Sequence, residues 1–187
     1  MQAAAVILAA GSSTRFGSPK QLARIDDVTL LERVIGVARD AGLAPIIAVV
    51  PPGMAVHVDV VAVPNDAPDE GMSRSLRLGF AAVPDDVDAA LVLLGDQPTM
   101  AVESVTRVLG AVRADSAVVA AAAGGRLAPP ILLMRAAFGL VDQADGDVGL
   151  APVLARHPEL VTRVEVGEHP PDVDVPTDLA SLRDGRT

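Results

Sequence analysis

The sequence contains no cysteine, tryptophan or tyrosine, and only three of its 187 residues are phenylalanine. The absence of cysteine excludes a disulfide scaffold, a thiolate metal site and a cysteine nucleophile, so any bound metal is expected to have oxygen ligands. Because half of the residues are hydrophobic, the core must be built from Ala, Val, Leu and Ile. This length suits one α/β domain, which we expect to span residues 1–187.

The chain also has little positive charge and no long apolar run. Its formal net charge is −9, with no basic stripe and no interleaved aromatic residues, which argues against nucleic-acid binding. The amino terminus lacks a basic region followed by a long apolar stretch, and the other apolar runs are short or interrupted. We therefore expect a cytoplasmic protein that binds neither nucleic acid nor a membrane.

Segments typical of strands and helices alternate along the chain, which predicts a mostly parallel sheet with helices on both faces. The connection over residues 51–58 is too short for a good crossover helix, so a loop is expected there. The expected strands are 6–8, 45–50, 59–63, 90–94, 116–122, 130–134 and 160–166, and the expected helices are 29–41, 72–83, 103–114, 135–141, 149–156 and 176–183.

The segment LAAGSSTRFGSPKQ, residues 8–21, joins the first predicted strand to a glycine turn and two cations. Ligands of open α/β sheets bind at the carboxyl edge, where this turn is expected. Backbone N–H groups of Gly11, Ser12 and Ser13 can point at phosphate oxygens. Arg15 adds a planar fork and Lys20 a mobile point charge. The segment indicates a triphosphate site; a plain strand-to-loop turn with solvated cations is the alternative.

The spacing fits neither a dinucleotide fingerprint nor a Walker loop, because Gly17 is followed by Ser18, Pro19 and then Lys20. Instead, LAAGSSTRFGSPKQL resembles the signature of nucleotidyltransferases related to the molybdenum cofactor cytidylyl- and guanylyltransferases. The resemblance implies a three-layer Rossmann-like fold of the nucleotide-diphospho-sugar transferase type. It also implies catalytic roles for Arg15 and Lys20, and nucleotide-binding roles for Leu8, Ala9, Ala10, Gly11, Ser12, Ser13, Arg15 and Lys20.

The segment LVLLGDQP, residues 91–98, is an apolar strand that ends in Gly-Asp and delivers one carboxylate to the same edge. A divalent ion could bridge this carboxylate to nucleotide phosphates. Closing a turn or capping the next helix is the alternative role for Asp96. In the family that the chain resembles, the aspartate of this segment holds the catalytic Mg²⁺, so Asp96 is expected to be a metal ligand and a catalytic residue.

The segment DVDVPTDL, residues 172–179, resembles the closing D-x-D-T-P-E-D-L motif of the same family. This resemblance implies that Asp174 is the partner of Asp96 at the Mg²⁺ ion. Val175 replaces the usual threonine and removes a hydroxyl. Taken alone, Asp174 is equally suited to begin a helix at Pro176, and Asp178 is suited to complement that helix dipole.

The segment EGMSRSLR, residues 70–77, places a glycine before a predicted helix start, which would present free N–H groups and two hydroxyls. It resembles the G-M-S-x-S-L segment of the cytidylyltransferase branch. The implied neighbours of the base and ribose are Gly71, Met72, Ser73 and Ser75, with Asn65 nearby. An ordinary serine helix cap is the alternative.

On the expected acceptor side, the family usually carries Gly-His-Pro or Gly-Asn-Pro, whereas this chain has Ala128-Pro129-Pro130. Pro130 is a candidate acceptor contact, although the polar side chain is missing. The segment Gly146-Asp147-Val148-Gly149 resembles the family's G-D-x-G turn. Asp147 could therefore form the turn or face the acceptor.

The resemblance extends from residue 6 to residue 182 and implies Mg²⁺-dependent transfer of a nucleoside monophosphate from a nucleoside triphosphate to the phosphate of a molybdopterin-type cofactor, with release of pyrophosphate. Ala10 matches the cytidylyl branch, which favours CTP over GTP, and a recipient molybdoenzyme would be a further partner. Two alternatives stay open: a sugar- or alditol-phosphate acceptor, and an inactive nucleotide- or cofactor-binding chaperone for a molybdoenzyme.

Overall fold

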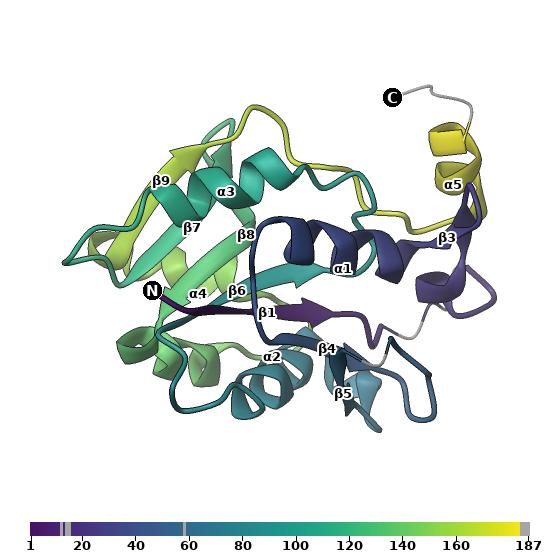
Figure 1. The fold of residues 1–187 in the computed structure, drawn as a ribbon, viewed down its shortest axis with the longest axis horizontal. Coiled ribbons are helices and arrows are strands. Elements are labelled where there is room, and N and C mark those ends of the chain that lie inside the picture. The colour runs from purple at the N-terminus through teal and green to yellow at the C-terminus, as the bar shows by residue number, and fades with distance from the viewer. Residues whose placement is uncertain (12, 14–15, 58, 184–187) are drawn as a thin grey trace.

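The computed structural model of the chain describes residues 1–11, 13, 16–57 and 59–183, and it is built around a central sheet (Figure 1). Seven strands lie in the order β5-β4-β1-β6-β8-β7-β9. Their bounds are β1 Ala3–Leu8, β4 Ile46–Val50, β5 Val60–Pro64, β6 Ala89–Leu94, β7 Val118–Ala123, β8 Arg126–Met134 and β9 Val161–Glu165.

The sheet is mostly parallel, as the sequence predicts. β1 pairs in parallel with β4 and β6, β4 with β5, and β7 with β9, whereas β8 runs antiparallel to both β6 and β7. The register places Leu8, at the end of β1, opposite Leu94, at the end of β6. The loops that follow these two strands therefore start side by side at one edge of the sheet.

Helices cover both faces of the sheet and form the two outer layers (Figure 1). α1, Leu30–Asp40, and α3, Val102–Gly110, pack on one face. α2, Met72–Ala81, and α4, Leu150–Ala155, pack on the other with the 3₁₀ helix Arg135–Gln143. Side chains of β1 alternate between the two cores, with Val6 in one and Ile7 in the other. The predicted three-layer Rossmann-like fold is confirmed.

The remaining elements are short and lie in the connections. They are the 3₁₀ helices η1 Lys20–Leu22, η2 Pro68–Glu70 and η4 Pro158–Leu160, the hairpin of β2 Arg24–Ile25 and β3 Val28–Thr29, and α5 Pro176–Arg183. In the described part of the chain no helix is both long and apolar enough to cross a membrane.

α1 begins one residue later than the sequence pattern predicts because Thr29 caps it. The Thr29 hydroxyl accepts a hydrogen bond from Glu32 N at 3.1 Å, and the Glu32 carboxylate accepts one from Thr29 N at 2.8 Å. This capping box satisfies two backbone donors that the first turn would otherwise leave unpaired.

Three local features differ from the predictions. The β2–β3 hairpin turns through Asp26 and Asp27, whose φ angles are 48° and 64°; the usual glycine signal of such a turn is missing from the sequence. β8 is longer than predicted and folds back on β7 through Gly124 and Gly125, both with positive φ. The helix predicted over residues 135–141 is a 3₁₀ helix and extends to residue 143.

The connection from β4 to β5 confirms the prediction of a short loop crossover. β4 and β5 pair in parallel, and the described residues between them contain no helix.

Gly79 lets α2 pack closely on β1, and substitution by alanine should lower the free energy of unfolding. An added Cβ would lie 2.4 Å from Cγ1 of Val6 and 3.1 Å from Cγ2 of Val49. We expect Gly79→Ala to destabilise the protein by about 1–3 kcal/mol in urea titrations. Gly36→Ala in α1, where a Cβ meets nothing within 4 Å, should instead stabilise it by about 0.5–1 kcal/mol. Similar effects of both substitutions would contradict this account of the packing.

Candidate active site

A cavity of about 610 Å³ opens at the carboxyl edge of the sheet, where β1 and β6 end. Six stretches of chain meet around it, including the first loop, the start of α2 and the segment before α5. Its walls are formed by Leu8, Ala9, Ala10, Gly11, Ser13, Lys20, Gln21, Pro68, Asp69, Glu70, Gly71, Met72, Ser75, Leu94, Gly95, Asp96, Gly146, Asp147, Asp172 and Asp174.

A glycine at the end of β6 brings this strand close to the first loop. Gly95 N donates to Leu8 O at 2.9 Å, and a Cβ at Gly95 would lie 2.7 Å from Cβ of Ala9. Only a residue without a side chain fits this approach. The Gly-Asp pair therefore places Asp96 directly beside the chain that follows β1.

The first loop is held in shape by Gln21, a residue without a predicted role. The side chain of Gln21 is buried, and its Nε2 donates to Gly11 O at 3.0 Å. Ser13 Oγ accepts from Lys20 N at 3.1 Å, which joins the two ends of the loop. Ser12 and Arg15, both predicted to bind phosphate, lie outside the described residues.

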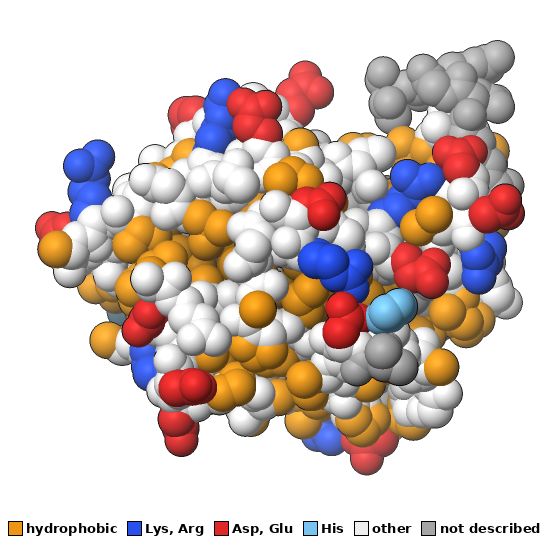
Figure 2. All heavy atoms as spheres, in the orientation of Figure 1, with side chains coloured by type: hydrophobic (Ala, Val, Ile, Leu, Met, Phe, Trp, Pro, Cys, Tyr) orange, Lys and Arg blue, Asp and Glu red, His pale blue; other side chains and the backbone are white. Residues whose placement is uncertain are grey.

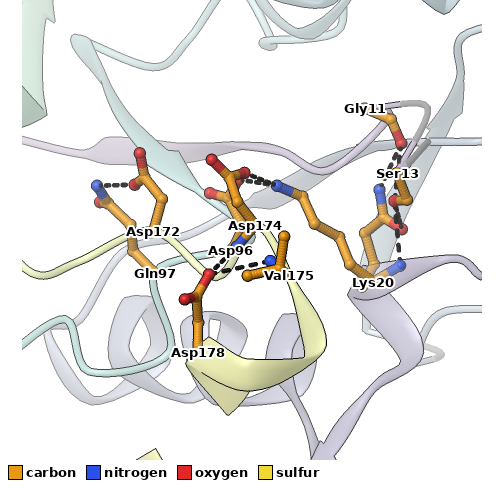
Figure 3. A network of polar contacts seen from close by, with 10 residues as sticks. Gly11, Ser13, Lys20, Asp96, Gln97, Asp172, Asp174, Val175 and Asp178 are labelled. Atoms are coloured by element: carbon orange, nitrogen blue, oxygen red, sulfur yellow. Dashed lines mark hydrogen bonds and ion pairs between the residues drawn. The ribbon is translucent and has the colours of Figure 1, made fainter. Parts of the chain in front are cut away.

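Lys20 bridges the two carboxylates that the sequence singles out as metal ligands (Figure 3). Its Nζ lies 2.6 Å from Asp96 Oδ2 and 3.0 Å from Asp174 Oδ1. Burial lowers the pKa of Lys20, but the hydrogen bonds to Asp96 and Asp174 and their negative charges outweigh it, so the pKa is raised above its ordinary value. The ammonium is therefore charged at neutral pH.

A third carboxylate, Asp172, lies in the same group and was not predicted as a site residue. Its Oδ1 accepts from Nε2 of the buried Gln97 at 2.8 Å (Figure 3). Partial burial raises the pKa of Asp172, the hydrogen bond from Gln97 works against this, and the charges of Asp96 and Asp174 raise it further; the net pKa is raised. The cavity thus contains a cluster of carboxylates that repel one another.

The segment that carries Asp174 is anchored by Asp178 at the start of α5. Asp178 Oδ2 accepts from the backbone N–H groups of Asp174 and Val175, both at 2.9 Å (Figure 3). These bonds lower the pKa of Asp178. The missing threonine hydroxyl at Val175 leaves this backbone anchoring in place.

The donor set suits a hard divalent cation. Oδ1 of Asp96 is buried and has no hydrogen-bond partner among the described residues, so a bound cation would satisfy an otherwise desolvated acceptor. Within the same part of the chain, no group of three or more His, Cys, Asp or Glu residues is arranged to hold a metal ion. Asp96 and Asp174, which share the contact with Lys20, offer two carboxylates, and a divalent ion bound to so few protein oxygens would keep water or phosphate oxygens as its other ligands.

The start of α2 is partly used for packing against another loop. Ser73 N donates to Gly146 O at 3.0 Å, so this N–H group is not free for a ligand. Gly71 has a φ of 87°, and its Cβ would meet the carbonyl carbon of Gly146 at 2.3 Å. Met72 and Ser75 line the cavity, whereas Ser73 is buried and does not.

Asn65, predicted to lie near the base, is fully buried and is not among the cavity-lining residues. Its Nδ2 donates to Ser75 Oγ at 3.0 Å, and its Oδ1 accepts from Ala67 N and from Nε of Arg74. These bonds tie the end of β5 to α2. Asn65 therefore supports the wall of the cavity from behind.

The two acceptor candidates are placed differently. Asp147 is exposed and lines the cavity beside Gly71. Pro130 is buried in β8 and does not line it. The register pairs Ala120 with Ile131 but Ala121 with Ala128, so Pro129 and Pro130 form a bulge, a position that suits residues lacking an N–H donor.

A mostly parallel sheet with helices on both faces, and a glycine loop, a lysine and carboxylates at its carboxyl edge, are the organisation expected of a nucleotidyltransferase. Residues 5–161 match the family described as the MobA-like NTP transferase domain, and the chain belongs to this family. None of the curated proteins compared with the chain matches it significantly.

Solved structures share the fold of this chain. Rv0371c from Mycobacterium tuberculosis is 29% identical, with a TM-score of 0.84 and 98% of each chain covered. A structure of Rv0371c in complex with manganese is 28% identical, with a TM-score of 0.79, and covers 98% of this chain and 99% of the other. Mth528, a nucleotidyl transferase from Methanothermobacter, is 23% identical and shares the fold with a TM-score of 0.80, over 99% and 97% of the two chains.

Gly71 should be needed for both stability and ligand binding because no side chain fits between it and Gly146. We expect Gly71→Ala to lower the free energy of unfolding by about 1–3 kcal/mol more than Gly167→Ala does. Gly167 has a similar φ of 85°, but a Cβ there meets nothing within 4 Å. Urea unfolding and nucleotide titration calorimetry of both variants test this. Equal losses in the two variants would show that backbone strain alone, and not the contact with Gly146, accounts for the effect.

Proposed function

We propose that this protein transfers a nucleoside monophosphate, with CMP favoured over GMP, from a nucleoside triphosphate to the phosphate of a molybdopterin-type cofactor. The observation that carries the proposal is the bridge from Lys20 to Asp96 and Asp174 inside the cavity that follows β1. It brings a phosphate-binding cation and two carboxylate ligands together beside the glycine loop, in a chain of the NTP transferase family.

The proposed reaction needs no nucleophilic side chain. An oxygen of the acceptor phosphate attacks the α-phosphorus, the bond from that phosphorus to the bridging oxygen of the β-phosphate breaks, and pyrophosphate leaves. Lys20, together with Arg15, would stabilise the negative charge that develops on the α-phosphate and on pyrophosphate. The glycine loop, held by Gln21, would keep the triphosphate in line with the acceptor.

Mg²⁺ is the proposed metal, held by Asp96 and Asp174. When bound, it would neutralise phosphate charge and polarise the phosphoryl oxygens. The buried and unpaired Oδ1 of Asp96 supports this role, as does the manganese complex of the similar protein Rv0371c.

The preference for CTP rests on Ala10, which is buried in the cavity wall next to Gly11. A sugar- or alditol-phosphate acceptor is the second candidate. Two residues expected to contact the acceptor support it. Pro130 is buried in β8 and does not line the cavity, whereas Asp147 does line it and has a carboxylate that can accept hydrogen bonds from hydroxyl groups.

Pyrophosphate release tests the proposal directly. CTP and GTP are each incubated with Mg²⁺ and either a molybdopterin-type acceptor or a panel of sugar and alditol phosphates. We expect release with CTP and the pterin acceptor, and a reduction in kcat/KM of about 10²–10³-fold in Lys20→Ala and Asp96→Asn.

Arg39→Ala is the matched control because Arg39 pairs with Asp59 on the surface, away from the cavity. Near-normal turnover of Lys20→Ala would overturn the catalytic assignment. Nucleotide binding without pyrophosphate release from any acceptor would favour a chaperone, and release with sugar phosphates alone would change the acceptor class.

A further inference from the structure

Lys20 is in direct contact with the carboxylate of Asp96. Of the two carboxylate oxygens of Asp96, Oδ1 is buried, and Oδ2 is in contact with the Lys20 ammonium at 2.6 Å. The same ammonium contacts Oδ1 of Asp174 at 3.0 Å. A divalent ion bound from the cavity through the oxygens that contact the ammonium, Oδ2 of Asp96 and Oδ1 of Asp174, would need the place that Nζ occupies, because metal–oxygen distances are only about 2.1 Å. Ammonium and ion cannot share this position, because both are cations and the spaces they fill overlap.

We propose that the Lys20 ammonium competes with the divalent ion for Asp96 and Asp174, and that the nucleotide ends this competition by drawing Lys20 onto its phosphates. The inference rests on the proposed function and adds an energetic coupling: metal and nucleotide bind as a cooperative pair. Lys20 thus has two alternating partners, the carboxylates and the triphosphate.

The position of Lys20 in the chain allows this exchange. Its backbone N–H is fixed by Ser13 Oγ, so its main chain belongs to the loop that is proposed to hold the triphosphate. The four-carbon side chain can turn from the carboxylates toward that loop without moving the backbone. The ammonium therefore needs only a change of rotamer to pass from one partner to the other.

The residue type also suits an exchange. Lys20 is the only lysine in the sequence, and the other 14 of its 15 basic residues are arginines. An arginine fork would bind the two carboxylates through several fixed donors, whereas an ammonium is a compact charge on a flexible stem. A lysine can thus neutralise Asp96 and Asp174 and still be displaced.

The charge of the cavity wall makes the two ligands depend on each other. Among the described residues, the cavity is lined by one ammonium and six carboxylates, those of Asp69, Glu70, Asp96, Asp147, Asp172 and Asp174, of which Glu70 is paired with Arg74. A triphosphate entering alone meets this negative wall, and an ion entering alone meets Lys20. When both enter, the ion replaces the ammonium at the carboxylates and the ammonium neutralises the phosphates.

Because the sequence has one lysine, ¹⁵N-lysine labelling gives a single side-chain ammonium signal in NMR spectra of the wild-type protein. We expect little change on adding Mg²⁺ alone and a clear shift when Mg²⁺ and CTP are added together. If calorimetry shows that both ligands have bound and the Lys20 signal has not moved, the exchange is wrong.

Metal affinity gives a second and independent measurement. Free Mn²⁺ is followed by electron paramagnetic resonance, with and without CTP, in the wild type, Lys20→Met, Lys20→Arg and Asp96→Asn. We expect Lys20→Met to bind Mn²⁺ alone roughly 10-fold more tightly than the wild type and to lose most of the increase that CTP causes. Lys20→Arg keeps the charge and should bind Mn²⁺ alone no more tightly than the wild type. Arg39→Met controls for the loss of one positive charge elsewhere.

The outcomes separate the inference from the proposed function. If Lys20→Met binds Mn²⁺ no more tightly than the wild type while Asp96→Asn loses CTP-dependent binding, the competition is wrong and the metal site stands. If Asp96→Asn binds Mn²⁺ and CTP like the wild type, the proposed metal site is wrong and the competition fails with it. Circular dichroism of each variant shows whether it is folded.

Discussion

The ion pairs of Lys20 with Asp96 and Asp174 are the interaction on which the organisation of the site depends. They join three segments, because Lys20 is 76 residues from Asp96 and 154 residues from Asp174 along the chain. Partly burying these charges is costly unless each has a partner of opposite sign. The carboxylates stabilise the ammonium, which in turn reduces their mutual repulsion. Loss of Lys20 would leave two carboxylates without a partner of opposite charge at the edge of the sheet.

The sheet supplies the geometry that makes this interaction possible. Since β1 and β6 are adjacent and parallel, the glycine loop and the segment with Asp96 start next to each other at the same edge of the sheet. Asp174 lies in the segment before α5, outside the sheet, and its backbone N–H donates to Asp178 at the start of α5. In Figure 1, α5 lies beside β3, and Leu179 of α5 packs with Ile25 of β2, so the small hairpin supports the segment that carries Asp174.

On the face drawn in Figure 2, basic side chains are scattered and do not gather in one patch.

Much of this arrangement could be predicted from the sequence because strong local signals carry it. Apolar strands alternating with amphipathic helices predicted the layers, and the motifs around Lys20 and Asp96 placed these residues at one edge. Asp174 was placed beside them only by the resemblance of its motif to the family. The roles of Gln21 and Asp172 could not be predicted, because they depend on contacts with Gly11 and Gln97 that only the folded chain creates. The antiparallel direction of β8 was missed for a related reason: strand direction depends on pairing and not on periodicity.

The close approaches at Gly95 and Gly71 bear on how this site would respond to random mutation. In a saturation scan, both positions should resemble the best-packed core residues in their intolerance, although neither contributes a side chain to chemistry or to the core. A sequence profile of such a scan would mark them beside Asp96 as if they were reactive groups. The intolerance at these two glycines would instead reflect how closely two segments of the backbone approach each other.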